Sequence, residues 1–140
     1  SIMTDPISVL DPPPPVCVSP ETSLAEAISR LKVNNVGALL ITGADGKLIG
    51  IFTERDVLYK VAGQVRDLSA IPVSQVMTPN PTALKATVPI AHALHLMSLH
   101  GFRHIPIVDD DGRPQGLPSF RGMVKFIGTN LAPATAHHAG

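Results

Sequence analysis

The most constraining feature of this chain is an internal repeat that keeps one register over most of its 140 residues. A constant shift of 66 residues, without a gap, aligns Asp45–Gly50 with Asp111–Gly116. It also matches further identical residues: Pro6 with Pro72, Ser8 with Ser74, Pro13 with Pro79, Pro15 with Pro81, Ala27 with Ala93, and Arg55 with Arg121. Such a register is typical of a duplicated unit. We expect copies at residues 6–61 and 72–128, a linker at 62–71 and a flexible tail at 129–140.

Each copy predicts the same order of elements, β-α-β-β-α. In the first copy, a short extended segment precedes a helix with apolar residues at i, i+3, i+4 and i+7, which Ser23 and Glu26 open as a capping box. Two strands joined by an Asp-Gly turn and a second helix follow. The expected elements of the first copy are Val16–Val18, a helix from Leu24, Ala38–Thr42, Leu48–Thr53 and Glu54–Ala62. Those of the second are Thr82–Leu84, a helix from Ile90, His104–Val108, Pro114–Ser119 and Phe120–Gly128.

The predicted fold class is α+β, with the two units packed against each other. One β-α-β-β-α unit is too small to cover both faces of its own sheet, so we expect the two copies to pack sheet to sheet about a pseudo-twofold axis.

Composition excludes several classes of function. Eleven Lys and Arg balance eleven Asp and Glu, whereas a general nucleic-acid binder normally has a basic excess. No apolar run is long enough to span a membrane, and no secretory signal is visible. The single cysteine, Cys17, excludes an internal disulfide and Cys-pair zinc sites. We therefore expect a cytoplasmic protein without nucleic-acid or membrane partners.

The motifs of the two copies resemble those of CBS domains. In the first copy, the resemblance lies in Gly37–Ile41, the Asp-Gly turn and the segment Gly50–Asp56. In the second, it lies in Val76–Pro81 and His104–Asp109. Two such domains in tandem resemble a Bateman module, here a stand-alone one. The resemblance implies a regulatory rather than catalytic protein, clefts between the copies that bind an adenine nucleotide, and a homodimer whose signal an unidentified effector protein reads.

Carried over onto this chain, the resemblance assigns one nucleotide site around Asp56. It makes Asp56 the acceptor for the ribose hydroxyls, with Thr53 beside it and Arg55 available for a phosphate. The adenine side would come from Thr78, Pro81 and Ala83, while Gly37 and Ala38 leave room for the ligand. Arg103 and His104 could face a phosphate or be an exposed basic pair. Spacing alone favours a simple capping box of their own helix for Thr53 and Asp56, and the resemblance to a tandem pair reverses this preference.

The site related to this one by the repeat departs from the family pattern. Gly122 stands at the position equivalent to Asp56, and Pro12 at that of Thr78. Because both losses fall in one cleft, we expect one nucleotide (AMP, ADP or ATP) per chain. The alternative function is a ligand-free dimerisation or scaffold module. We expect no metal, no resident cofactor and no enzymatic activity, since no nucleophile–base set can be assembled around Cys17.

Overall fold

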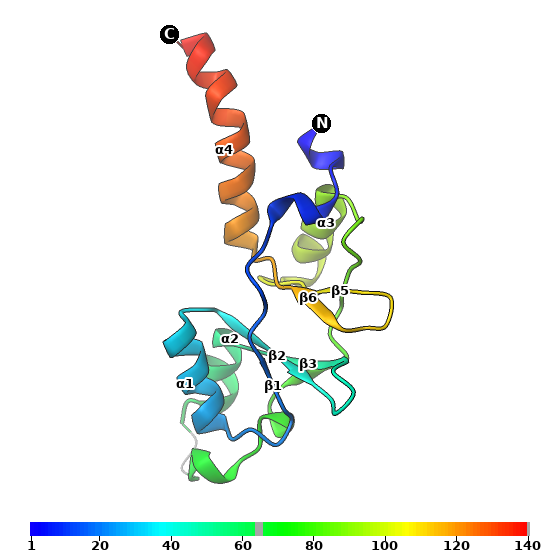
Figure 1. Cartoon of the computed structure of the whole chain (residues 1–140). Coiled ribbons are helices and arrows are strands. Elements are labelled where there is room, and N and C mark those ends of the chain that lie inside the picture. Colours follow the sequence, from blue (N-terminus) through cyan, green and yellow to red (C-terminus); the bar gives the residue numbers. More distant parts are fainter. Residues whose placement is uncertain (64–65, 140) are drawn as a thin grey trace.

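The computed structural model describes residues 1–63 and 66–139, which form two lobes, one stacked on the other (Figure 1). The first lobe contains β1 (Cys17–Val18), α1 (Leu24–Asn34), β2 (Ala38–Thr42), β3 (Leu48–Thr53) and α2 (Glu54–Asp56), followed by a π-helical turn, η3 (Val57–Val61). The predicted strands β2 and β3 are confirmed at their bounds. Ser23 caps α1 by accepting a hydrogen bond from the Glu26 N–H.

The second lobe repeats this order with shorter strands. It contains α3 (Ile90–His100), β5 (Ile107–Val108), β6 (Pro114–Gly116) and α4 (Phe120–Ala139). The predicted strand at 82–84 is reduced to one bridge between Leu84 and Ile107. Proline has no N–H to donate to a ladder, and the second copy has prolines where the first has Leu40, Leu48 and Phe52: Pro106, Pro114 and Pro118.

The last helix is longer than predicted. We expected it to end near Gly128, but α4 continues to Ala139. Gly128 costs a helix only about 1 kcal/mol, so the helix continues past it; it also continues through Pro133, although proline is unfavourable inside a helix. None of the described helices is long and apolar enough to cross a membrane.

The segment that leads into each copy packs on the other copy. In front of copy one, η1 (Ile2–Thr4) and η2 (Ile7–Leu10) lie against the second lobe, where the Ile7 N–H donates to the Val88 carbonyl at 2.7 Å. In front of copy two, η4 (Leu68–Ala70) and η5 (Val73–Gln75) lie against the first lobe, where the Val73 N–H donates to the Thr22 carbonyl at 2.6 Å. The two bonds are related by the 66-residue shift, so the exchange obeys the pseudo-twofold symmetry.

Each lobe has its own hydrophobic core, completed by the exchanged segment. Val73 and Ile71 are buried in the first core with Phe52, and Ile7 is fully buried in the second with Met123. The predicted boundaries at residues 61 and 72 thus follow the repeat in the sequence. In space, each lobe also includes the segment that precedes the other copy, which we call its lead segment (η1 and η2, or η4 and η5).

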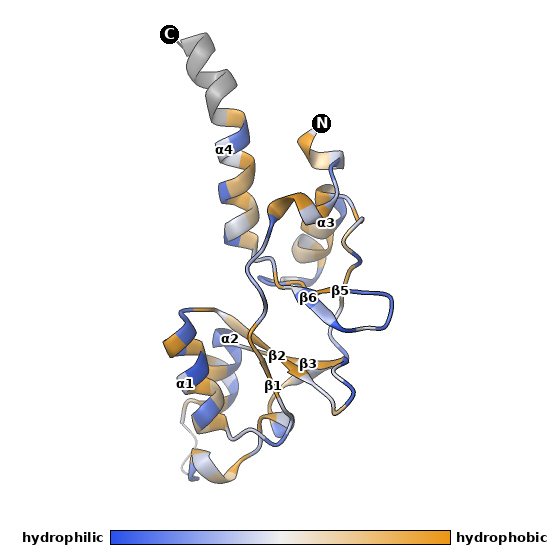
Figure 2. Cartoon of the chain, in the orientation of Figure 1, coloured by the Kyte–Doolittle hydropathy of each residue, from blue (hydrophilic) through white to orange (hydrophobic). Residues whose placement is uncertain are grey.

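The two lobes meet through their sheets. The first sheet has the order β1-β2-β3-β4, in which β4 (Thr78–Pro79) begins the second copy and pairs antiparallel with β3. Ala38, Leu40 and Ile51 form a third buried cluster, against which Leu117 of the second copy packs. Figure 2 colours β2 and β3 mostly as hydrophobic, in agreement with this contact. The sheet-to-sheet packing is as predicted.

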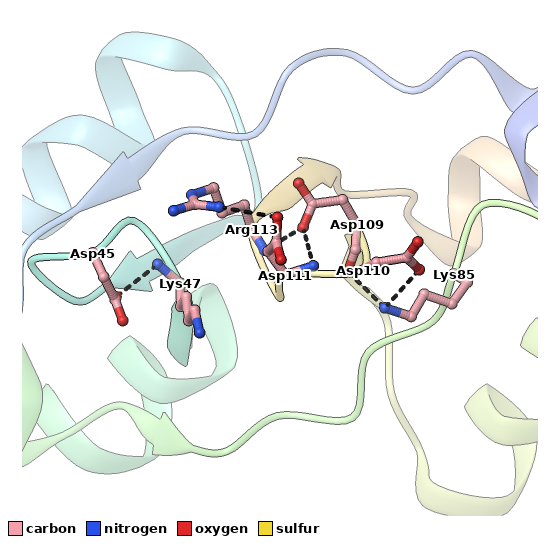
Figure 3. A network of polar contacts seen from close by, with 7 residues as sticks. All are labelled: Asp45, Lys47, Lys85, Asp109, Asp110, Asp111 and Arg113. Atoms are coloured by element: carbon pink, nitrogen blue, oxygen red, sulfur yellow. Dashed lines mark hydrogen bonds and ion pairs between the residues drawn. The ribbon is translucent and has the colours of Figure 1, made fainter.

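The two Asp-Gly turns lie next to each other at one edge of the lobe interface (Figure 3). The Leu48 N–H donates to the Gly112 carbonyl at 2.9 Å and so joins the turns. Asp109 accepts hydrogen bonds from the N–H groups of Asp111 and Arg113, and the bond from Arg113 is the main reason that the pKa of Asp109 is lowered. Lys85 donates to the Asp109 carbonyl. This acidic loop is thus a hydrogen-bonded turn, as predicted.

Candidate functional site

A cavity of about 270 Å³ lies between the copies, around the end of β3. We call it the Asp56 cavity. Its lining residues come from β3 and α2 of the first copy and from two segments of the second: Ile51, Thr53, Arg55, Asp56, Thr78, Asn80, Pro81, Thr82, Gly101, Phe102, Arg103, His104 and Pro106.

Asp56 is the one charged side chain that is buried among the described residues, with 7% of its surface exposed. Its Oδ2 accepts a hydrogen bond from the Thr53 N–H at 2.9 Å and lies 3.3 Å from the Thr53 hydroxyl. The Asp56 N–H donates to that hydroxyl in return, which completes a capping box. Because both residues also line the cavity, the capping role and a ligand-binding role coexist in the same side chains.

Lys60 compensates the charge of this buried carboxylate. Its Nζ lies 3.0 Å from Asp56 Oδ1 and donates to the Val76 carbonyl at 3.1 Å. A buried carboxylate needs a partner of opposite charge or several hydrogen bonds, and Asp56 has both.

Basic residues from both copies line the cavity: Arg55 from the first, Arg103 and His104 from the second. The Arg103 guanidinium lies over the Phe120 ring, 5.5 Å from its centroid, and Arg55 reaches the Gly101 carbonyl at 3.5 Å. Partial burial lowers the pKa of His104, and the nearby Glu54 carboxylate opposes this effect. The cavity is thus lined by one carboxylate residue, Asp56, and by two arginines, Arg55 and Arg103, a composition suited to a polar anionic ligand.

A second cavity, of about 300 Å³, is related to the first by the repeat. We call it the mirror cavity. Gly122 lines it where Asp56 lines the first cavity, Pro12 stands in place of Thr78, and Ser119 in place of Thr53. The Ser119 hydroxyl caps α4 by accepting the Gly122 N–H. The mirror cavity therefore retains the cap and lacks the carboxylate, as the sequence predicts.

Seven of the ten predicted site residues line the Asp56 cavity: Thr53, Arg55, Asp56, Thr78, Pro81, Arg103 and His104. Gly37 and Ala38 instead line the mirror cavity. A Cβ on Gly37 would lie 2.8 Å from Glu54 Oε1 and 3.0 Å from His104 Cε1, so the glycine makes room for these two side chains. Ala83 does not line the Asp56 cavity. Thr82 does, and successive side chains of an extended segment point to opposite sides.

The sequence did not predict the apolar residues that line the Asp56 cavity, nor one polar residue, Asn80. Ile51, Phe102 and Pro106 have no signal that separates them from core residues. Asn80 does have a signal in the sequence, because it stands between two prolines. In the structure it has a positive φ of 47°, a conformation that asparagine tolerates. Its N–H donates to the Ile49 carbonyl at 3.0 Å, and it faces the cavity next to Thr78.

The described residues contain no group of three His, Cys, Asp or Glu side chains that could hold a metal ion. His92 and His95 lie three residues apart on α3 without a third ligand of this kind beside them.

Comparison with known proteins gives one family. The CBS domain profile matches residues 1–63 and 73–117. A 17.7 kDa protein from Acidianus ambivalens is 32% identical over 110 residues, which are 79% of this chain and 65% of that protein. The chain therefore spans less than two thirds of this relative.

Solved structures agree with the chain over most of its length. A CBS-domain containing protein from Agrobacterium tumefaciens is 33% identical, with a TM-score of 0.78, and the match covers 88% of this chain and 93% of that one. A CBS domain protein from Pyrobaculum aerophilum complexed with AMP is 27% identical, with a TM-score of 0.76 and coverages of 84% and 88%. A CBS domain pair in complex with 5′-methylthioadenosine and S-adenosyl-L-methionine is 25% identical, with a TM-score of 0.79 and coverages of 88% and 99%.

Proposed function

The chain belongs to the CBS domain family as a tandem pair, and from this premise we propose that it is a regulatory module that binds one adenine nucleotide per chain in the Asp56 cavity. The observation that supports this most is the buried Asp56 carboxylate, which lines a cavity formed by both copies. Two similar structures contain adenosine compounds, AMP in one and 5′-methylthioadenosine with S-adenosyl-L-methionine in the other.

In this proposal, Asp56 accepts hydrogen bonds from the ribose hydroxyls, and Thr78 and Pro81 lie against the base. Arg55, Arg103 and His104 face the phosphate. AMP, ADP and ATP are the candidate ligands, and the even charge balance of the chain favours the less charged of them. Binding transmits a signal only if it favours one conformation of the pair over another, and an effector protein must then read that conformation.

Thermal unfolding with AMP, ADP, ATP and S-adenosyl-L-methionine tests the proposal. We expect a concentration-dependent rise in Tm with an adenine nucleotide, and a calorimetric stoichiometry of one per chain. Two equal sites per chain would contradict the single-site part, and no shift with any of these compounds would contradict nucleotide binding.

The Asp56→Ala variant separates ligand binding from capping. A charge-assisted hydrogen bond contributes about 1.5–3 kcal/mol, so we expect the variant to lose most of the ligand-induced rise in Tm. Ser23→Ala is the matched control, because it removes the cap of α1, outside the cavity, at a cost of about 1 kcal/mol. It should lower Tm and leave the ligand-induced rise unchanged. If Asp56→Ala behaves like Ser23→Ala, Asp56 is a cap only.

The second candidate function is a dimerisation or scaffold module, which one observation favours. Val33, Leu58, Tyr59 and Val124 are large apolar side chains that stand exposed on the helices. We propose that two copies associate through such faces. Light scattering should then give twice the chain mass, with or without nucleotide. A dimer that binds no nucleotide would favour the scaffold.

A further inference from the structure

Lys60 holds together two parts of the Asp56 cavity without lining it. We propose that Lys60 is a positioning residue for ribose recognition, fixing the Asp56 carboxylate and the neighbouring β4 segment in their binding geometry. This inference rests on the proposed nucleotide site and adds the residue that orders it.

Lys60 and Thr53 bind the two oxygens of the Asp56 carboxylate from opposite sides. Thr53 binds Asp56 Oδ2 through its N–H at 2.9 Å, and Lys60 Nζ lies 3.0 Å from the other oxygen, Oδ1. With one oxygen held from each side, the plane of the carboxylate is fixed. Rotation about the last side-chain bond, which is otherwise broad for aspartate, is then restricted before any ligand arrives. Recognition of two adjacent hydroxyls by one carboxylate depends on that plane.

Lys60 also binds the backbone of the segment that leads into β4. Lys60 Nζ also donates to the Val76 carbonyl at 3.1 Å, two residues before Thr78, which lines the cavity. Thr78 pairs with Ile51 of β3. Lys60 therefore connects the first copy, which supplies Asp56, to the lead segment of the second copy, which supplies Thr78.

The mirror cavity provides an internal comparison. Its equivalents of Asp56 and Lys60 are Gly122 and Phe126, so the lysine is lost together with the carboxylate. Phe126 cannot form an ion pair, and yet α4 and the fold of the second lobe persist. The fold therefore does not require a lysine at this position, and the lysine is found only beside the carboxylate.

The test compares AMP with 2′,3′-dideoxy-AMP, which lacks both ribose hydroxyls. We expect the wild-type chain to prefer AMP by about tenfold or more, the worth of one lost charge-assisted hydrogen bond. The Lys60→Met variant keeps the aliphatic stem. It should bind AMP about tenfold more weakly and 2′,3′-dideoxy-AMP almost unchanged, so that most of the preference for AMP is lost. Lys60→Arg should restore most of the preference, because a guanidinium can also bridge a carboxylate and a carbonyl.

Lys125→Met is the matched control, since it removes an equal charge from an exposed position on α4 outside the cavity. It should keep the wild-type preference. If Lys60→Met weakens both ligands equally, Lys60 acts only through charge or stability, and the positioning role is wrong while the nucleotide site stands. A wild-type chain that binds neither ligand overturns the proposed function, and this inference with it.

Discussion

At the scale of single residues, His104 lies where three hollows of the molecule meet. It lines the Asp56 cavity, the mirror cavity and a wide hollow between α1, η3 and the start of α4. It also lies beside Glu54 and above Gly37. Its protonation therefore changes the charge of all three hollows at once.

This position makes stability depend on pH in a defined direction. Burial lowers the pKa of His104 below 6.5, so the unfolded chain takes up the proton first as the pH falls. The contribution of the neutral His104 to stability is present in full above pH 6.5. It is lost as the pH falls from 6.5 through the lower pKa that His104 has in the folded chain. We expect the fall in Tm between pH 7.5 and pH 5.5 to be larger for the wild type than for His104→Asn. Equal falls in thermal unfolding scans would show that His104 is not the group responsible.

The residue scale also shows what the sequence could predict of the site. The Thr53–Asp56 pair was predictable because helix caps follow a local spacing rule, and the loss of Asp56 in the second copy follows from alignment alone. Gly37 was misplaced because its close neighbours, Glu54 and His104, come from distant parts of the chain. Lys60 was missed because an i, i+4 ion pair looks like ordinary surface charge until the burial of its partner is known.

At the scale of elements, the repeat does not predict that the segment before each copy packs on the other copy. Local pattern predicts β2 and β3 to the residue, since their apolar runs and the Asp-Gly turn between them are continuous in the chain. It does not predict which lobe η2 or η5 packs on, because that choice depends on contacts between residues far apart in the sequence, such as Ile7 with Val88 and Val73 with Thr22. It also overestimated the strands of the second copy, where Pro106 and Pro114 interrupt an otherwise apolar pattern.

The exchange makes a testable prediction about η2. Ile7 is fully buried in the core of the second lobe, although it precedes the first copy. Ile7→Ala should lower the free energy of unfolding by about 2–4 kcal/mol, as measured by urea denaturation. Val9→Ala is the matched control, because Val9 lies in the same short helix but is 40% exposed, and it should cost about 0.5 kcal/mol or less. Similar costs for both variants would mean that η2 is not part of the second core.

At the scale of the whole molecule, two related cavities are present, and only one has a carboxylate at the start of the helix that lines it; the acidic residue of the mirror cavity, Asp11, lies in the segment before β1. The walls of both survive because they are the sheet faces and helix starts on which each lobe depends. A buried carboxylate has a desolvation cost, which for Asp56 is offset by the capping box with Thr53 and by the ion pair with Lys60. Under the proposed function, we attribute the difference between the cavities to ligand binding.

If this is correct, restoring the missing groups should open a second site. We expect the double variant Pro12→Thr, Gly122→Asp to bind two adenine nucleotides per chain in a calorimetric titration, where the wild type binds one. A new Cβ at 122 would lie 3.0 Å from the Ser119 hydroxyl, a close contact that requires a small shift of this side chain, and a negative charge in the first turn of a helix is stabilising. The control Pro12→Thr, Gly122→Ala adds the Cβ without the charge and should still bind one. A folded double variant that binds only one nucleotide would show that features other than the lost carboxylate and hydroxyl close the mirror cavity. Pro14 would be the first to examine, because it stands at the position equivalent to Asn80, which lines the Asp56 cavity.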